Sequence, residues 1–150
     1  MNLSSADQMS RDMNQPQDIQ TDDKKELALR ERLLRRQFYI CMTERVLRSG
    51  DAMADLKPLM SEHLAWISGL EDSGLAFAAG PFRDNNDPAY WNGDGMFILR
   101  ADSKEAAAAI ADTCPFHSSG LRRYKIIPWW LNEGSIQLTV KLANKQVILG

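Results

Sequence analysis

The spacing of apolar positions alternates between a period typical of strands and one typical of helices. Residues 37–46, QFYICMTERV, are rich in aromatic and β-branched side chains and predict a strand. Shorter apolar runs, each bounded by turn-forming residues, predict four further strands at 75–82, 95–101, 121–130 and 135–143. Most of the chain after residue 36 therefore predicts a strand-rich domain.

The segment between the first two strands follows a helical period. Residues 53–73 place apolar side chains three or four positions apart, and His63 shares their face. Gly74 is expected to end this helix, because glycine adopts the left-handed backbone found just after helices. Pro58 is expected in its first turn, where a missing N–H is tolerated.

A second helix is predicted to begin after Ser103, whose hydroxyl can cap it, and the run Ala106–Ala109 favours that state. The order strand–helix–strand–strand–helix–strand is the ferredoxin-like βαββαβ plan, an α+β fold with two helices on one face of the sheet. The other face would carry large apolar side chains. We expect a second subunit to bury it, giving a homodimer or a higher homo-oligomer.

Residues 1–36 differ in character from the predicted domain at 37–150. Residues 1–23 hold five aspartates and one arginine with few large apolar side chains, which predicts a mobile acidic tail. Residues 24–36 hold six basic and two acidic side chains, with Leu27 and Leu34 on one face of a short amphipathic helix. Such a helix suits a membrane, a nucleic acid or a protein surface. We expect packing on its own domain or a partner subunit, because the acidic tail offsets its charge.

Composition narrows the class of protein without indicating an activity. The 150 residues are 44% hydrophobic and 25% charged, which excludes a collagen-like, fully disordered or disulfide-scaffold chain. The net charge of −2 argues against nucleic acid as a partner. No apolar run reaches the roughly 18 residues that cross a membrane. The first residues lack the pattern of a secretory signal, and two cysteines are too few for a disulfide framework. We therefore expect a cytoplasmic location.

Two side chains are candidates for chemistry, and each has a structural alternative. A neutral imidazole at His63 can accept a proton from carbon or oxygen and return it, but a core histidine bonded to a carbonyl fits the same position. Cys114 can serve as a nucleophile or acid–base group if a neighbour lowers its pKa, but a buried, inert thiol is the commoner case.

Substrate-binding candidates lie near the predicted loop 83–93 and the second helix. Arg83 can hold an anion in fixed geometry, and Tyr90 and Trp91 can stack on an aromatic ligand or pack against a subunit. His117, in a turn, can orient a substrate or remain solvated. The metal-binding patterns CxxC and HExxH and the phosphate-binding loops GxGxxG and Walker A do not occur, so we expect no metal or other cofactor.

Three segments together resemble the YCII-related family, within the dimeric α/β-barrel group of ferredoxin-like proteins. They are EHLAWISGLEDSGLAFAAGPF, GMFILRADSKEAAAAIAD and CPFHSSGLRRYKIIPWW. The family site implied by this resemblance pairs a helix histidine with the aspartate of a DPF motif. His63 matches the histidine. The aspartate position falls on Cys114, since this chain reads DTCPF, and Asp112 lies two residues earlier.

The resemblance implies a small, cofactor-independent enzyme acting on an intermediate of aromatic degradation. The expected reaction is a lyase or isomerase step, such as dehydrochlorination of a chlorinated hydroxyquinol. His63 would be the base, Asp112 or Cys114 its partner, and Arg83 an anion anchor. The alternative is a non-catalytic ligand-binding or assembly module, which is supported by the loss of the family aspartate at Cys114.

Overall fold

The chain divides into two compact units in the computed structural model, which describes residues 16–46, 48–83, 87, 90–143 and 145–149. One unit comprises Arg35–Leu131, and the other combines residues up to Leu34 with those from Asn132 onward. The predicted domain at 37–150 ran to the end of the chain, whereas this compact unit ends at Leu131. Residues 1–15 of the predicted acidic tail lie outside the described residues, and residues 16–23, for which a mobile tail was predicted, are helical.

A four-stranded antiparallel sheet forms the base of the Arg35–Leu131 unit. Its strands are β1 (Arg36–Arg45), β2 (Ala76–Pro81), β3 (Gly95–Leu99) and β4 (Arg122–Leu131). Their spatial order is β2-β3-β1-β4, and every neighbouring pair is antiparallel. This is the strand order of the ferredoxin-like plan. The predicted α+β fold is therefore confirmed.

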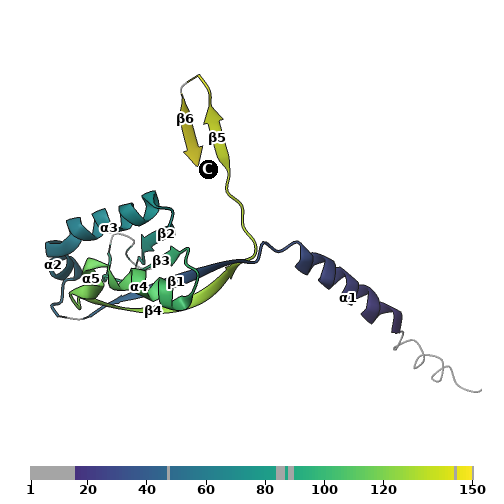
Figure 1. Ribbon diagram of the computed structural model, residues 1–150, viewed down its shortest axis with the longest axis horizontal. Helices are drawn as coiled ribbons and strands as arrows, with labels where there is room; N and C mark the ends of the chain where they lie inside the picture. Colours follow the sequence, from purple (N-terminus) through teal and green to yellow (C-terminus); the bar gives the residue numbers. More distant parts are fainter. Residues whose placement is uncertain (1–15, 47, 84–86, 88–89, 144, 150) are drawn as a thin grey trace, which may run out of the picture. The chain divides into compact units, whose positions relative to one another are not determined.

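The helices of this unit lie on one face of the sheet (Figure 1). They are α2 (Ala52–Leu56), a 3₁₀ turn η1 (Lys57–Leu59), α3 (Met60–Asp72), α4 (Lys104–Asp112) and α5 (Pro115–Ser118). The single helix predicted over 53–73 was wrong, because the chain changes to 3₁₀ geometry around Pro58. Proline has no backbone N–H to donate to the carbonyl one turn earlier, and its ring clashes with that carbonyl. The predicted start of α4 is confirmed, since Ser103 Oγ accepts from the N–H of Ala106 at 3.0 Å.

The core lies between the helices and the inward side chains of the sheet. Tyr39 and Cys41 of β1 alternate inward, in register with Leu99 and Phe97 of β3. Two fully buried alanines of α4, Ala107 and Ala111, pack on the same cluster. Small side chains there let the helix approach the sheet closely.

The outward face of the sheet is also rich in apolar side chains. Phe38 lies 4.7 Å from Phe77 and 6.1 Å from Trp129, measured between ring centroids. The guanidinium of Arg100 lies over the rings of Phe38 and Phe77. Ile127, on the same face as Trp129, is 36% exposed. None of the described helices of this unit covers that face.

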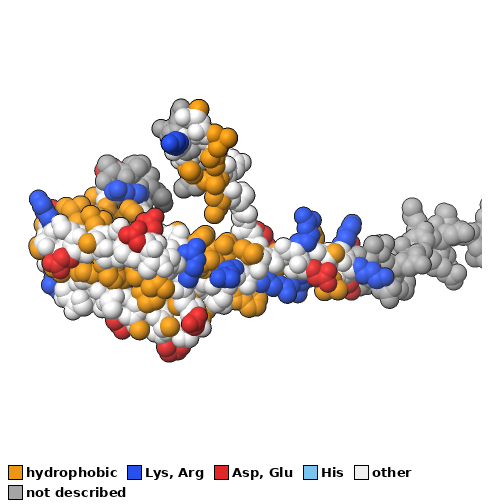
Figure 2. Space-filling view, turned by 45° about the horizontal axis from the view of Figure 1, so that its top comes forward, with side chains coloured by type: hydrophobic (Ala, Val, Ile, Leu, Met, Phe, Trp, Pro, Cys, Tyr) orange, Lys and Arg blue, Asp and Glu red, His pale blue; other side chains and the backbone are white. Residues whose placement is uncertain are grey.

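The other unit contains α1 (Pro16–Glu31) and a hairpin of β5 (Leu138–Lys141) with β6 (Gln146–Leu149). The helix begins and ends earlier than the prediction of 24–36. Leu34 therefore lies beyond it, and Leu27 is 60% exposed, so the predicted apolar face is not formed. Arg35, just before β1, has a positive φ of 51°. The strand predicted at 135–143 exists as β5, but it pairs in its own hairpin, whose side chains shown in Figure 2 are largely hydrophobic on one side.

Gly95 offers a test of the β2–β3 pairing. A Cβ on Gly95 would lie 2.7 Å from the backbone oxygen of Gly80, whereas a Cβ on Gly80 would meet nothing within 4 Å. We predict that Gly95→Ala lowers the free energy of unfolding by about 1–3 kcal/mol, because the strands must separate. Gly80→Ala, the matched control, should change it by less than about 0.5 kcal/mol. Urea unfolding measures both, and equal effects would contradict the close strand approach.

Candidate functional site

A cavity of about 640 Å³ lies between α3 and the strands β2 and β3 of the Arg35–Leu131 unit. Its wall is mainly apolar, with Met60 and Ile67 from α3 and Phe97 from β3. Polar groups reach it at few points, among them His63 and Arg122. An apolar cleft of this size with a few convergent polar groups is typical of a site for a small ligand.

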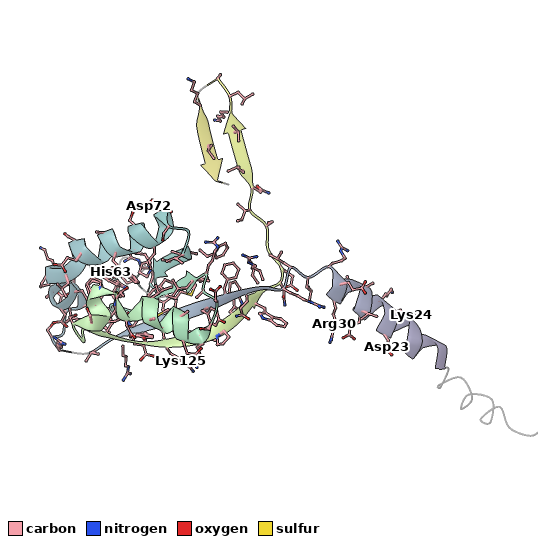
Figure 3. All side chains as sticks on the ribbon, viewed as in Figure 1. Asp23, Lys24, Arg30, His63, Asp72 and Lys125 are labelled. Atoms are coloured by element: carbon pink, nitrogen blue, oxygen red, sulfur yellow. The ribbon has the colours of Figure 1, made fainter. Side chains whose placement is uncertain are left out.

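His63 lies on the side of α3 that faces the sheet and α5 (Figure 3). Its ring stacks on Phe116 of α5, with the centroids 4.3 Å apart, and Nδ1 lies 3.4 Å from Sγ of Cys114. Burial, and then the positive charge of Arg122, lower the pKa of His63 to about 4. The imidazole is therefore neutral at pH 7.

Cys114 determines which nitrogen of His63 remains for a ligand. The thiol is fully buried at the start of α5, and burial raises its pKa, so it remains protonated. Its contact occupies Nδ1, and Nε2 has no hydrogen-bond partner among the described residues. When Nδ1 holds the ring proton, Nε2 presents a lone pair. When the thiol donates to Nδ1, Nε2 presents an N–H instead.

Arg122 is a polar group of the cavity that the sequence patterns did not indicate, as are Thr43, Asp51 and Asp94. The residue is only 7% exposed, and its guanidinium carbon lies 5.1 Å from the ring centroid of Trp91 and 4.7 Å from that of Phe116. No carboxylate in the described part of the chain lies within ion-pair distance, and its Nε has no hydrogen-bond partner. Alternation along β4 places Arg122 on the same face as buried Ile126, and that pattern was available in the sequence.

Trp91 is held in place by the end of the β2–β3 loop. Its indole N–H donates to the backbone oxygen of Asp94 at 2.7 Å, and the carboxylate of Asp94 accepts from the backbone N–H of Arg45 at 2.7 Å. Gly93 between them has φ 100°, and a Cβ there would lie 2.7 Å from the Arg45 side chain. Only glycine fits this position, so the loop presents Trp91 to Arg122 in a defined geometry.

Three residues predicted to bind substrate line the cavity. Arg83 reaches it from just after β2, and Tyr90 and Trp91 border it from the end of the same loop. Residues 84–86, 88 and 89 of the predicted loop lie outside the described residues. The structure thus brings these three side chains to the same cavity as His63.

Asp112 and His117 do not line this cavity. The carboxylate of Asp112 accepts from the hydroxyl of Tyr124 at 2.5 Å, and burial together with this bond raises the pKa of Tyr124 to about 12. The partner of His63 is Cys114, because Ala111 and Cys114 point inward near the end of α4 while Asp112 points outward. The Nδ1–H of His117 donates to the carbonyl of Ala111 at 2.7 Å.

His117 is half-buried at the helix–sheet interface and does not lie in a solvated turn. Its ring lies between Phe97 and Tyr124, with centroid distances of 6.0 and 4.7 Å. Its Nε2 is buried without a hydrogen-bond partner in the described part of the chain. His117 therefore supports the floor of the site and does not reach the ligand space.

Within the described ranges, no three His, Cys, Asp or Glu side chains come together as a metal ion would require. The described helices also include none that is both long and apolar enough to span a membrane.

A family model for the YCII-related domain matches residues 38–130, most of the compact unit. The chain belongs to the YCII-related domain family. The match ends where β4 ends, so α1 and the β5–β6 hairpin lie outside it.

The YCII-related chain is also similar to a solved structure, the 5-chloro-2-hydroxyhydroquinone dehydrochlorinase of Burkholderia phenoliruptrix AC1100 in complex with 2,5-dihydroxybenzoquinone. The two are 18% identical, the TM-score is 0.49, and the match covers 61% of this chain and 92% of that one. No curated protein matches the chain.

The low pKa of His63 predicts how stability depends on pH. An unfolded histidine takes up a proton near pH 6.5, whereas folded His63 does so only near pH 4. The free energy of unfolding should therefore fall as pH drops from about 6.5 to about 4, because protons bind preferentially to the unfolded chain. His63→Gln should flatten this dependence in urea unfolding. Some slope should remain, since burial also lowers the pKa of His117. A variant curve parallel to that of the wild type would show that His63 titrates normally.

Proposed function

We propose that the YCII-related unit binds a small aromatic or ring-derived molecule in its cavity and that His63 moves a proton on it. The reaction would be a cofactor-independent elimination or isomerisation. The observation that carries the proposal is the neutral imidazole of His63 at the wall of a largely apolar cavity, with Nδ1 engaged by Cys114 and Nε2 left for the ligand. The aromatic surroundings of Phe97, Tyr90 and Trp91 suit a flat ring.

The electrostatics of His63 favour a particular kind of proton transfer. A base with a pKa near 4 removes protons best from acidic positions, such as a phenolic oxygen or the carbon beside a ring carbonyl. The imidazolium that forms would stand beside the positive charge of Arg122. It is therefore stabilised only while negative charge develops on the substrate. In an elimination, the negative charge would leave the ring with chloride and the imidazolium would then release its proton to water. In an isomerisation, the imidazolium would return the proton to another atom of the substrate.

The first test combines binding with turnover on chlorinated hydroxyquinols, catechols and lactones. We predict that at least one compound raises the melting temperature of the wild type, because it binds only the folded state. His63→Gln should lower kcat for halide release or isomerisation by about 10²–10⁴-fold. His117→Gln, which removes the imidazole outside the cavity lining, should retain turnover to the extent that it remains folded.

Equal turnover by wild type and folded His63→Gln would contradict the proton-transfer mechanism.

The second candidate function, a non-catalytic ligand-binding or assembly module, is favoured by Cys114 in place of the expected aspartate. A thiol is a weaker hydrogen-bond acceptor than a carboxylate and does not hold the Nδ1 proton of His63 firmly. Thermal stabilisation by a ligand without turnover is the signature of such a module.

We also propose that two copies of the unit pair through the outward face of the sheet. Ile127 and Trp129 lie on this apolar face, and the described helices of the unit pack on the opposite side. Sedimentation should show a dimer for the wild type and a monomer for Ile127→Glu, because a buried carboxylate without a partner is costly. Met53→Glu, at an exposed apolar position on α2, is the matched control and should remain dimeric. A monomeric wild type would overturn this pairing.

A further inference from the structure

The geometry points to Arg122 as the residue that selects a carboxylate-bearing ring compound as the ligand of the cavity. This inference rests on the proposed binding role of the cavity and goes beyond it in naming the anionic group and the residue that recognises it. The sequence had indicated Arg83 as the anion anchor, and both arginines line the cavity.

The charge of Arg122 is buried without a counter-ion in the described part of the chain. Taking a guanidinium out of water costs several kcal/mol, and a buried charge normally has a carboxylate partner. Arg45, whose side chain is also buried, follows that rule, since it pairs with Asp55 at 3.0 Å. Arg122 contacts two aromatic rings in place of a carboxylate. A cation–π contact offsets only part of the free energy needed to remove the guanidinium from water.

The nearby carboxylate of Asp94 is already engaged. Its Oδ1 accepts from the backbone N–H of Arg45, and its Oδ2 accepts from the side-chain amide of Asn92 at 3.0 Å. Both bonds hold the loop that carries Trp91. The charge of Asp94 acts on Arg122 through space and opposes the lowering of its pKa by burial, but the described residues form no ion pair between the two. An anion from outside the unit can therefore make the direct contact that Asp94 does not.

The packing of the guanidinium favours a planar anion. The rings of Trp91 and Phe116 lie against it, which leaves the N–H groups at its edge for a polar ligand. Its Nε is buried and donates to no described residue. A carboxylate meets such an edge with two parallel hydrogen bonds in one plane, and the ring that carries it would lie among the apolar side chains of the cavity.

His63 and Arg122 line the same cavity, so one ligand can reach both. A carboxylate bound at Arg122 would fix the ring relative to Nε2 of His63, as proton transfer requires. The same anion would neutralise the charge that now disfavours the imidazolium form of His63. Binding and proton transfer would then depend on the same guanidinium.

The test compares benzoate and 2,5-dihydroxybenzoate with the corresponding amides, which keep the shape and remove the charge. We expect calorimetric titration of the wild type to show at least tenfold tighter binding of each acid than of its amide. Arg122→Met should lose this preference, whereas Arg122→Lys should keep part of it, since a lysine supplies charge without the planar fork. Arg83→Gln, the control at the other cavity arginine, should keep the full preference.

The melting temperature of Arg122→Met tests separately whether this variant folds. Arg122→Met should be at least as thermally stable as the wild type without ligand, because it replaces an unpaired buried charge with an apolar side chain. The preference of the acids over the amides is then measured on a folded protein. A large loss of melting temperature in Arg122→Met would show that the charge is already compensated within the protein, which overturns the inference.

The remaining outcomes separate this inference from the proposed function. Equal binding of acid and amide by the wild type would overturn the carboxylate assignment and leave the cavity as a ligand site. A preference that persists in Arg122→Met and disappears in Arg83→Gln would move recognition to Arg83. No binding of acid or amide would also overturn the carboxylate assignment, while the hydroxyquinol assays decide the proton-transfer proposal on their own.

Discussion

The positive charge of Arg122, buried at the start of β4, is the constraint on which the geometry of the cavity depends. A guanidinium removed from water needs compensation, and here it comes from the faces of two aromatic rings. Trp91 belongs to the β2–β3 loop and Phe116 to α5. The same guanidinium therefore contacts two segments that are distant in sequence. The loop then needs the left-handed Gly93 and the Arg45–Asp94 hydrogen bond to present its indole at that point.

The same charge defines the chemistry of His63. Together with burial it keeps the imidazole neutral, and Cys114 adds a hydrogen-bond contact to Nδ1 without adding a negative charge. A carboxylate at position 114 would favour the protonated ring, as in a His/Asp pair. This YCII-related chain therefore combines a weaker base with a cation that forms no ion pair with a described carboxylate, and both features favour a ligand that brings its own negative charge.

Local patterns in the sequence predicted most of the fold correctly. β1, β4 and the start of α4 lie within one or two residues of their predicted positions, because alternation and a serine cap depend on neighbours in the chain. The helix over 53–73 was predicted without its 3₁₀ interruption, because Pro58 was expected in the first turn, where it is tolerated. The N-terminal helix was predicted too far along the chain. Leu34 was assigned to its apolar face, but the helix ends at Glu31.

The sequence by itself determined the order of strands and helices, and with it the inward position of His63 on α3. Only the tertiary structure decided which groups meet His63 and Arg122. Two positions separate the two candidate partners of His63 in the sequence, yet Asp112 turns outward to Tyr124 while Cys114 turns inward. The Arg-Arg pair at 122 and 123 looks uniform in sequence, yet one guanidinium meets Glu44 and the other is buried under Trp91. Periodicity reflects the nearest few residues, whereas burial and pairing depend on segments that become neighbours only when the sheet and its helices assemble.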